Sequence, residues 1–206
     1  MTMLQRATFT GLGFAAILLF AFAKPVPAAE PQAASIAGDF LVAAPSIADP
    51  RFAKTVIYMV SHDRDGAMGL VINRVLGQGT LKAYMKGPGL ALGKASGKIK
   101  LHQGGPVQVN IGIALYDGDA TAADTQEAGN GLRLASHVAV LEAMAEGREF
   151  KDALFFLGYA GWGPGQLERE LATGDWLTAP FDAELLFDDD APDQWQRARK
   201  RAGVTL

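Results

Sequence analysis

Residues 55–73 read TVIYMVSHDRDGAMGLVIN, and this stretch decides the expected fold. Its first part, 55–60, is a run of β-branched, aromatic and other apolar residues, which is typical of a strand. A polar segment follows and ends at Gly66, a residue that can adopt the positive φ of a tight turn. A second apolar run, 67–72, comes directly after this glycine. The stretch therefore predicts a β-hairpin.

Similar patterns extend outward from the hairpin. Further short apolar runs predict strands at 40–43, 111–116, 153–157 and 176–179. Helices are expected after Ser136, at 166–172 and at 192–202, with a helical turn within 182–187. The strands come in groups before the helices and do not strictly alternate with them. This order favours an α+β fold, a single compact domain at 38–206 with a largely antiparallel sheet and a few flanking helices.

Composition narrows the class of protein. The chain has 206 residues, of which 49% are hydrophobic and 20% charged, as expected of one globular domain. Its formal net charge of −3 and its sequence pI near 5.6 lack the basic excess of a dedicated nucleic-acid-binding protein. The sequence contains no cysteine, which excludes a disulfide, a thiolate nucleophile and a Cys-based metal site.

The N-terminus has the layout of a secretory signal peptide. Arg6 precedes an apolar run, 7–23, and small-residue cleavage sites follow. At about 1.5 Å per residue this run spans about 26 Å, slightly less than a bilayer core of about 30 Å. We therefore expect a signal peptide at 1–28, a tether at 29–37, and a periplasmic or secreted protein. An uncleaved membrane anchor is the alternative.

Cleavage changes the charge of the protein. Residues 1–28 contain Arg6 and Lys24 and no acidic residue, so their removal moves the formal net charge from −3 to −5.

The segment 75–101 differs in amino-acid composition from the rest of the chain. It contains five lysines, six glycines and no acidic residue. We expect an excursion from the fold that is solvated by its lysines, with a helical turn at 81–85. An acidic partner, nucleic acid or anionic lipid is the alternative interpretation of these charges.

His62 is the most suggestive titratable residue. It ends an expected strand close to Asp63 and Asp65, so it could act as a general base or a metal ligand oriented by a carboxylate. The competing interpretation is a histidine that fixes the turn by hydrogen bonds. The other histidines, His102 and His137, lack the spacing of a metal motif. No metal site and no cofactor are expected.

Two glycine-rich segments could bind an anion through backbone N–H groups. One is 158–165, GYAGWGPG, between an expected strand and an expected helix, and the other contains Gly104 and Gly105. Neither has the Lys-Ser/Thr or G-x-G-x-x-G pattern of a phosphate loop. Tight turns are favoured, the first of them packing Tyr159 and Trp162 on the core.

Several motifs in one order resemble the YqgE/AlgH family, over residues 38–204. They are GDFLVAAP at 38–45, DPRF at 49–52, VIYM at 56–59, GAMGLVINR at 66–74, GGPV at 104–107, LGYAGW at 157–162, GQLE at 165–168 and WLTAP at 176–180. The resemblance implies a compact α+β domain around an antiparallel sheet and no established reaction. Some members of the family are labelled transcriptional regulators.

The chain departs from the family pattern in three places. Family members usually lack a signal peptide and look cytosolic. After GGPV the family commonly has an acidic residue and an arginine, where this chain has QVNI at 108–111. The segment 75–101 is also richer in lysine and glycine than the family pattern.

These observations favour an exported, non-enzymatic binding protein. Its pocket is expected where the His62 hairpin, the Gly104 turn and the Gly158 loop approach one another, because binding residues tend to collect in loops. The candidate ligand-binding residues are His62, Gly66, Asn73, Gly104, Gly105, Tyr159 and Trp162. The expected partner is a small molecule or an envelope protein, with membrane contact only through the signal segment.

Two other functions stay open at this point. A hydrolase or metal-dependent enzyme would use His62 with Asp63 or Asp65. A transcriptional regulator would require a cytosolic protein whose N-terminus is not exported.

Overall fold

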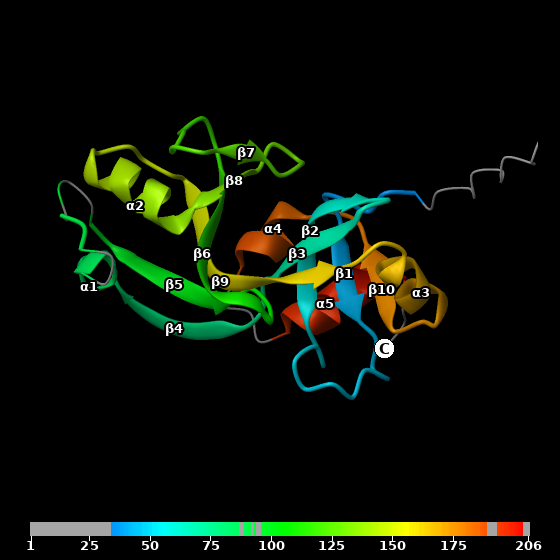
Figure 1. Ribbon diagram of the computed structural model, residues 1–206. Coiled ribbons are helices and arrows are strands. Elements are labelled where there is room, and N and C mark those ends of the chain that lie inside the picture. Colours follow the sequence, from blue (N-terminus) through cyan, green and yellow to red (C-terminus); the bar gives the residue numbers. More distant parts are fainter. Residues whose placement is uncertain (1–33, 87–88, 92, 94–95, 189–192, 204–206) are drawn as a thin grey trace, which may run out of the picture. The chain divides into compact units, whose positions relative to one another are not determined.

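The computed structural model describes residues 34–86, 89–91, 93, 96–188 and 193–203 (Figure 1). The expected signal peptide and most of the expected tether lie outside the described residues. The described residues, which begin at Ala34, form one compact unit. Among the described residues, no helix has the length and apolar character needed to cross a membrane.

Strand β9 (Asp152–Trp162) organises the sheet (Figure 1). Its first half lies between β5 (Lys98–Gln103), which runs parallel to it, and β6 (Val107–Asp117), which runs antiparallel. Its last residues pair with β3 (Gly66–Val71), also antiparallel. One strand therefore belongs to both halves of the sheet, and the largely antiparallel α+β fold expected from the sequence is confirmed.

The first half of the sheet contains the expected hairpin. Strand β2 (Val56–Asp63) pairs with β3, and Gly66 at the turn has a φ of 137°. Beyond β2 come β1 (Phe40–Ala43) and β10 (Trp176–Ala179), each antiparallel to its neighbour. The hairpin prediction is confirmed because the apolar runs and the glycine were local signals that needed no distant partner.

The second half of the sheet corrects the expectation for 75–101. This segment contains strand β4 (Val75–Thr80), helix α1 (Leu81–Lys86) and most of β5. β4 is antiparallel to β5, which continues the sheet to β9. The sequence analysis did not predict β5, because its apolar residues, Ile99 and Leu101, alternate with lysines and form no continuous apolar run. On the far side of β6 lie β8 (Arg133–Ser136) and β7 (Gln126–Glu127).

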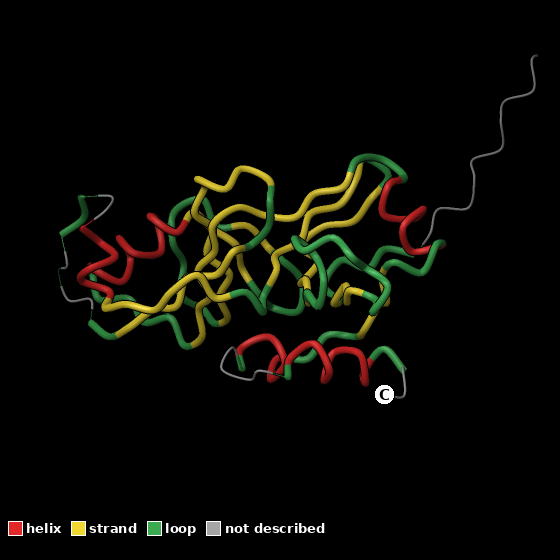
Figure 2. The backbone as a smooth tube through the Cα atoms, turned by 90° about the horizontal axis from the view of Figure 1, so that it is seen from below, coloured by secondary structure: helices red, strands yellow, loops and turns green. Residues whose placement is uncertain are grey.

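Helices cover both faces of the sheet (Figure 2). Helices α4 (Ala183–Phe187) and α5 (Gln194–Arg201) lie together on one face. Helix α3 (Gln166–Ala172) contacts β3 and β10, and α2 (His137–Ala145) contacts β6 and β8. These positions agree with the expected helices, although the hydroxyl of Ser136 makes no capping bond to α2.

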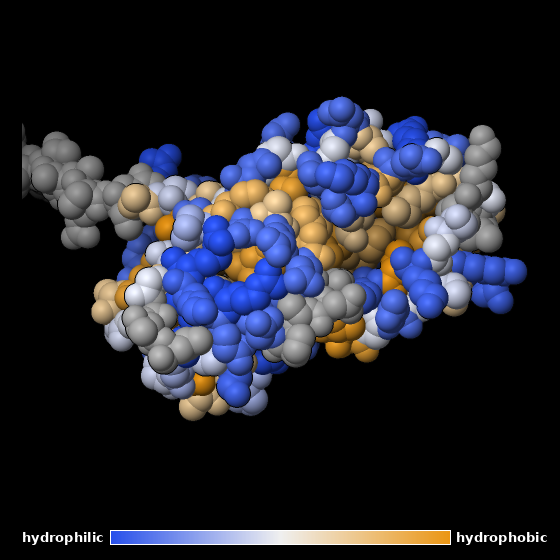
Figure 3. Space-filling view, turned by 180° about the vertical axis from the view of Figure 1, so that it is seen from behind, coloured by the Kyte–Doolittle hydropathy of each residue, from blue (hydrophilic) through white to orange (hydrophobic). Residues whose placement is uncertain are grey.

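Alternation along the strands divides the core. In β1 and β2, Phe40 and Tyr58 pack on the side of α4 and α5, whereas Leu41 and Ile57 pack with Leu167 of α3. A third cluster fills the space beneath α1 and α2. Successive residues of a strand point to opposite faces, so helices on both faces bury the whole of β1. Some apolar surface nevertheless stays uncovered between hydrophilic side chains (Figure 3).

The two halves of the sheet meet at a glycine junction, formed by Gly104, Gly105 and Gly158. Gly104 donates its N–H to the carbonyl of Leu157 and accepts from the N–H of Val71, each at 2.9 Å. A Cβ at Gly105 would overlap the backbone of Tyr159. The junction is therefore a place where backbones pack directly on each other.

The expected turn at 158–165 is mostly strand. β9 continues through Gly158, whose φ of 68° changes the direction of the strand without ending it. The pairing with β6 shifts register opposite this point, between Val107 and Gly112, and β3 then takes over as the neighbour. Glycine content indicated a turn, but the hydrogen bonds to β3 preserve the strand as far as Trp162.

Replacing Gly105 by alanine should destabilise the fold. The new Cβ would overlap the backbone of Tyr159, and the φ of 155° disfavours a side chain, so we expect a loss of more than about 2 kcal/mol in the free energy of unfolding. Urea denaturation measures this loss. In the control Gly77→Ala, the Cβ has no atom within 4 Å, so the change should stay within about 0.5 kcal/mol. Equal effects of the two substitutions would contradict the role of the junction.

Candidate functional site

His62 is a buried, fully hydrogen-bonded residue. Its side chain is 3% exposed. The backbone N–H of Ile36 donates to Nδ1 at 3.2 Å, which leaves the proton on Nε2 to be donated to Glu168 Oε1, also at 3.2 Å. Both ring nitrogens are thus engaged, and they tie the segment before β1 and helix α3 to the hairpin.

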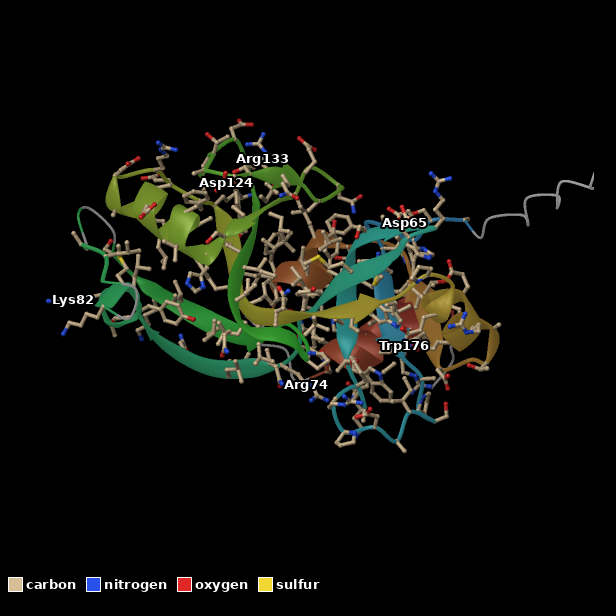
Figure 4. All side chains as sticks on the ribbon, viewed as in Figure 1. Asp65, Arg74, Lys82, Asp124, Arg133 and Trp176 are labelled. Atoms are coloured by element: carbon tan, nitrogen blue, oxygen red, sulfur yellow. The ribbon has the colours of Figure 1, made fainter. Side chains whose placement is uncertain are left out.

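The two aspartates near His62 do not converge on it. Asp63 and Asp65 are exposed, and Asp63 Oδ1 accepts the backbone N–H of Asp65 at 2.8 Å. Asp65 lies at the tip of the hairpin (Figure 4). Asp63 therefore has a structural role, because its side chain stabilises the turn of the hairpin.

Most of the other expected ligand-binding residues belong to the framework. The side chain of Asn73 accepts the N–H of Val56 at 2.9 Å and donates to the carbonyl of Lys54 at 2.8 Å. Gly66 packs against the backbone of Trp162. Tyr159 packs on the core cluster beneath α4 and α5, whereas Trp162 packs on the opposite one, so the two side chains share no pocket.

A groove of about 500 Å³ opens on the α3 side of the sheet. We call it the tryptophan groove. The loop after β1, the turn before β6, the end of β9, helix α3 and the start of β10 form its walls. Its lining includes Arg51, Phe52, Pro106, Trp162, Gln166, Glu170, Asp175 and Trp176. Trp176 lies beside α3 in Figure 4.

One carboxylate holds the two tryptophans in place. Glu170 Oε2 accepts the indole N–H of Trp162 at 2.9 Å and that of Trp176 at 2.8 Å. Its other oxygen accepts the amide of Gln166 at 2.8 Å. The indole rings meet edge to face at 6.0 Å, and Phe52 adds a further edge contact to Trp176 at 5.7 Å. These contacts hold the aromatic side chains of the wall in one arrangement.

The rim of the groove carries a charged pair. Arg51 contacts both carboxylate oxygens of Asp49, with the shortest distance, from Nη2 to Oδ2, at 2.7 Å. These hydrogen bonds lower the pKa of Asp49. The Arg51 side chain is 65% exposed, so most of its guanidinium faces water.

A smaller hollow of about 180 Å³ adjoins the groove and shares Arg51 and Pro106 with it. Gly105 and Arg74 also line it. Arg74 donates to the carbonyls of Pro50 at 2.8 Å and Ala53 at 3.1 Å, which positions its guanidinium beneath the loop after β1.

Comparison with known proteins gives this geometry a context. The family model described as AlgH-like matches residues 40–206. The chain belongs to the YqgE/AlgH family. A UPF0301 protein of Methylococcus capsulatus is 46% identical over 173 residues, which cover 84% of this chain and 94% of the relative. A UPF0301 protein of Xanthomonas campestris is 41% identical, covering 83% and 91%.

A solved structure supports the same assignment, and a second one shares the fold. The solution structure of the AlgH protein from Pseudomonas aeruginosa has 40% sequence identity and a TM-score of 0.69, covering 84% of this chain and 91% of that one. A Corynebacterium diphtheriae protein at 23% identity has a TM-score of 0.64 over 84% and 88% of the two chains, and it shows the shared fold. In this member of the YqgE/AlgH family, the motifs at 49–52, 157–162, 165–168 and 176–180 contribute residues to the groove or to the elements beside it.

Sequence reasoning found only part of this site. Of the expected residues, Trp162 lines the groove and Gly105 lines the adjoining hollow. Glu170 and Trp176 were missed, because nothing in their spacing indicates that they meet. Among the described residues, no group of three or more His, Cys, Asp or Glu side chains is placed to hold a metal ion.

Removing the carboxylate of Glu170 should loosen the groove. Glu170→Ala deprives two largely buried indole N–H groups of their acceptor, so we expect a loss of about 2 kcal/mol or more in the free energy of unfolding. Tryptophan fluorescence should also shift, because two of the chain's three tryptophans are affected. Denaturation and emission spectra give both readouts.

Two companion variants test the interpretation. Glu170→Gln retains an acceptor oxygen and should lose less stability than Glu170→Ala. Glu184→Ala removes an 84% exposed side chain from a surface ion pair and should cost less than about 1 kcal/mol. An unchanged emission spectrum in Glu170→Ala would refute the shared-carboxylate arrangement.

Proposed function

We propose that this protein is an exported, non-enzymatic binding protein whose small ligand occupies the tryptophan groove. The observation that carries the proposal is the pair of indole N–H groups fixed on Glu170 at the wall of a cavity of about 500 Å³. Ligand sites are typically concave, largely formed in advance and lined by aromatic side chains with a few placed polar groups. This groove is concave, and its indole rings are already positioned by Glu170.

The polar groups of the groove indicate how a ligand would be held. Phe52, which is half-buried against the edge of Trp176, offers apolar surface for a flat or aliphatic part of the molecule. Arg51 and Gln166 are exposed donors at its margin. The ligand is therefore a small molecule with an apolar part and hydrogen-bond acceptors.

Binding is favoured over catalysis by the state of the candidate catalytic groups. A general base needs a free lone pair within reach of its substrate. The Nδ1 lone pair of His62 accepts from Ile36, and Nε2 donates to Glu168. His62 is also absent from the groove lining, as are Asp63 and Asp65. A hydrolase or metal-dependent enzyme based on His62 has no comparable support in the described residues.

Ligand binding should stabilise the folded protein. We expect at least one compound from a panel of aromatic carboxylates, dipeptides and nucleoside monophosphates to raise the melting temperature. A ligand at 100 times its Kd adds about 2.7 kcal/mol, which corresponds to several degrees. Arg51→Ala and Gln166→Ala should each reduce this shift, whereas Lys82→Ala, on α1 and outside the groove, should leave it unchanged. If no compound shifts the melting temperature, or if the shift survives both groove substitutions, the groove is not the ligand site.

The export part of the proposal rests on the N-terminal sequence and has its own test. Intact mass of the protein from fractionated cells should show an N-terminus between Lys24 and Glu30 in the envelope fraction. A full-length mass in the cytosol would contradict export. It would also return the transcriptional-regulator alternative to consideration, and binding to double-stranded DNA would then be measured.

A further inference from the structure

Strand β4 is a lightly protected edge strand. Its pairing with β5 shifts register between Val75 and Gly77, before the regular pairs that run from Gly77 to Thr80. In the part of the chain that the structure describes, β5 is its only neighbouring strand. Its sequence, VLGQGT, contains no charged residue and no proline. Val75 is 48% exposed and Leu76 is 53% exposed. Natural sheets usually guard an exposed edge with lysine, proline, a strong bulge or a covering element, because unpaired backbone groups are templates for another strand.

The register shows which backbone groups of β4 are free to pair. Gln78 lies opposite Lys100, Gly79 opposite Ile99 and Thr80 opposite Lys98. Just beyond the strand, in the same register, Leu81 donates its N–H to the carbonyl of Gly97 at 3.0 Å. Hydrogen-bonded pairs alternate along an antiparallel ladder, so Gly79 bonds to β5, while the N–H groups of Gln78 and Thr80 point away from the sheet.

The surroundings of this edge are basic. Between Val75 and Gln103 the sequence has no acidic residue. Lys82 and Lys86 on α1 and Lys98 on β5 are exposed, and Figure 4 shows Lys82 extending away from the molecule. Beside β4 lies a hollow of about 330 Å³ whose lining includes three lysines, Lys98, Lys100 and Lys151, and one acidic residue, Asp152, which lies 3.9 Å from the Lys151 ammonium. Carboxylates placed along this edge would therefore meet opposite charge.

We propose that β4 is a docking edge for an extended, acidic segment of a partner protein, which adds to the sheet as a further strand. Main-chain hydrogen bonds from the outward N–H groups of Gln78 and Thr80 would supply the affinity, and the lysines would select acidic side chains. A second copy of this chain fits less well, because pairing two β4 edges would bring two lysine-rich surfaces together.

The docking edge is separate from the tryptophan groove. No residue of β4 lines the groove, and none lines the hollow that adjoins it. The proposal therefore stands or fails independently of the small ligand. It requires only that the outward backbone groups of β4 can be reached by a strand.

Fluorescence anisotropy on the folded chain tests the proposal. The probe is a labelled peptide of about eight residues, alternating valine and glutamate, which is long enough to span β4. The matched probe has lysine in place of glutamate. We expect the acidic peptide to bind with at least about tenfold higher affinity than the basic one, and the Lys82→Glu, Lys98→Glu double variant to reverse this preference.

A pair of substitutions at Gln78 separates the backbone from the side chain. Gln78→Pro removes an N–H that points away from β5, so it should weaken binding about tenfold while leaving the ladder intact. Gln78→Ala keeps the N–H and should change binding by less than about threefold. If the proline variant melts at a lower temperature, hydrogen exchange on the unmodified protein decides. The acidic peptide should slow exchange at Gln78 and Thr80 and leave Gly79 unchanged.

Three results would overturn the proposal. They are no binding of the acidic peptide at about 1 mM, equal affinity for the two peptides, or exchange protection that misses Gln78 and Thr80. Sedimentation analysis of the free protein tests the alternative occupant of β4, a second copy of this chain. If the free protein forms a dimer that Gln78→Pro dissociates and Gln78→Ala does not, a second copy covers β4, and the acidic partner is wrong.

Discussion

The architecture depends on the direct packing of backbone on backbone at the glycine junction. Gly104 is bonded to both Val71 and Leu157, which joins the end of β3 to the middle of β9. Side chains at Gly104 or Gly105 would occupy the space of the β9 backbone. Because the strands approach so closely there, β9 can pair first with β5 and β6 and then with β3. A single strand thus connects the two halves of the sheet.

The tryptophan groove follows from the way β9 ends. By continuing past Gly158 to Trp162, the strand carries an indole to the same face as Trp176 of β10. Helix α3 starts a few residues later and brings Glu170 within hydrogen-bond distance of both indole N–H groups. A buried polar group without a partner is costly, so one carboxylate that satisfies two indoles gives the wall a unique arrangement. Stability and shape of the groove therefore have the same source.

The two proposed surfaces recognise different chemistry. The tryptophan groove presents side chains whose polar atoms are already positioned, and it suits a small molecule that fills a fixed volume. The β4 edge presents backbone groups and a basic surrounding, and it suits a chain in extended conformation. The lysine-rich composition of this part of the chain thus gains a structural explanation, because Lys82, Lys86 and Lys98 lie close to the open edge.

Local signals in the sequence determined much of the fold. The hairpin around Gly66, the strands at 40–43 and 176–179 and the helix at 166–172 were all predictable, because each depends on the period of apolar residues and on nearby turn residues. The family motifs indicated the same α+β architecture.

By contrast, β4 has few apolar residues and two glycines, so only its pairing with β5 makes it a strand. Glycine content at 158–162 likewise indicated a turn where long-range hydrogen bonds maintain β9. The contacts of His62 with Ile36 and Glu168, and of Glu170 with two tryptophans, join residues from separate elements. The sequence by itself therefore determined the elements whose conformation is local, and the tertiary structure alone decided the site, because non-local strand pairing sets which side chains meet.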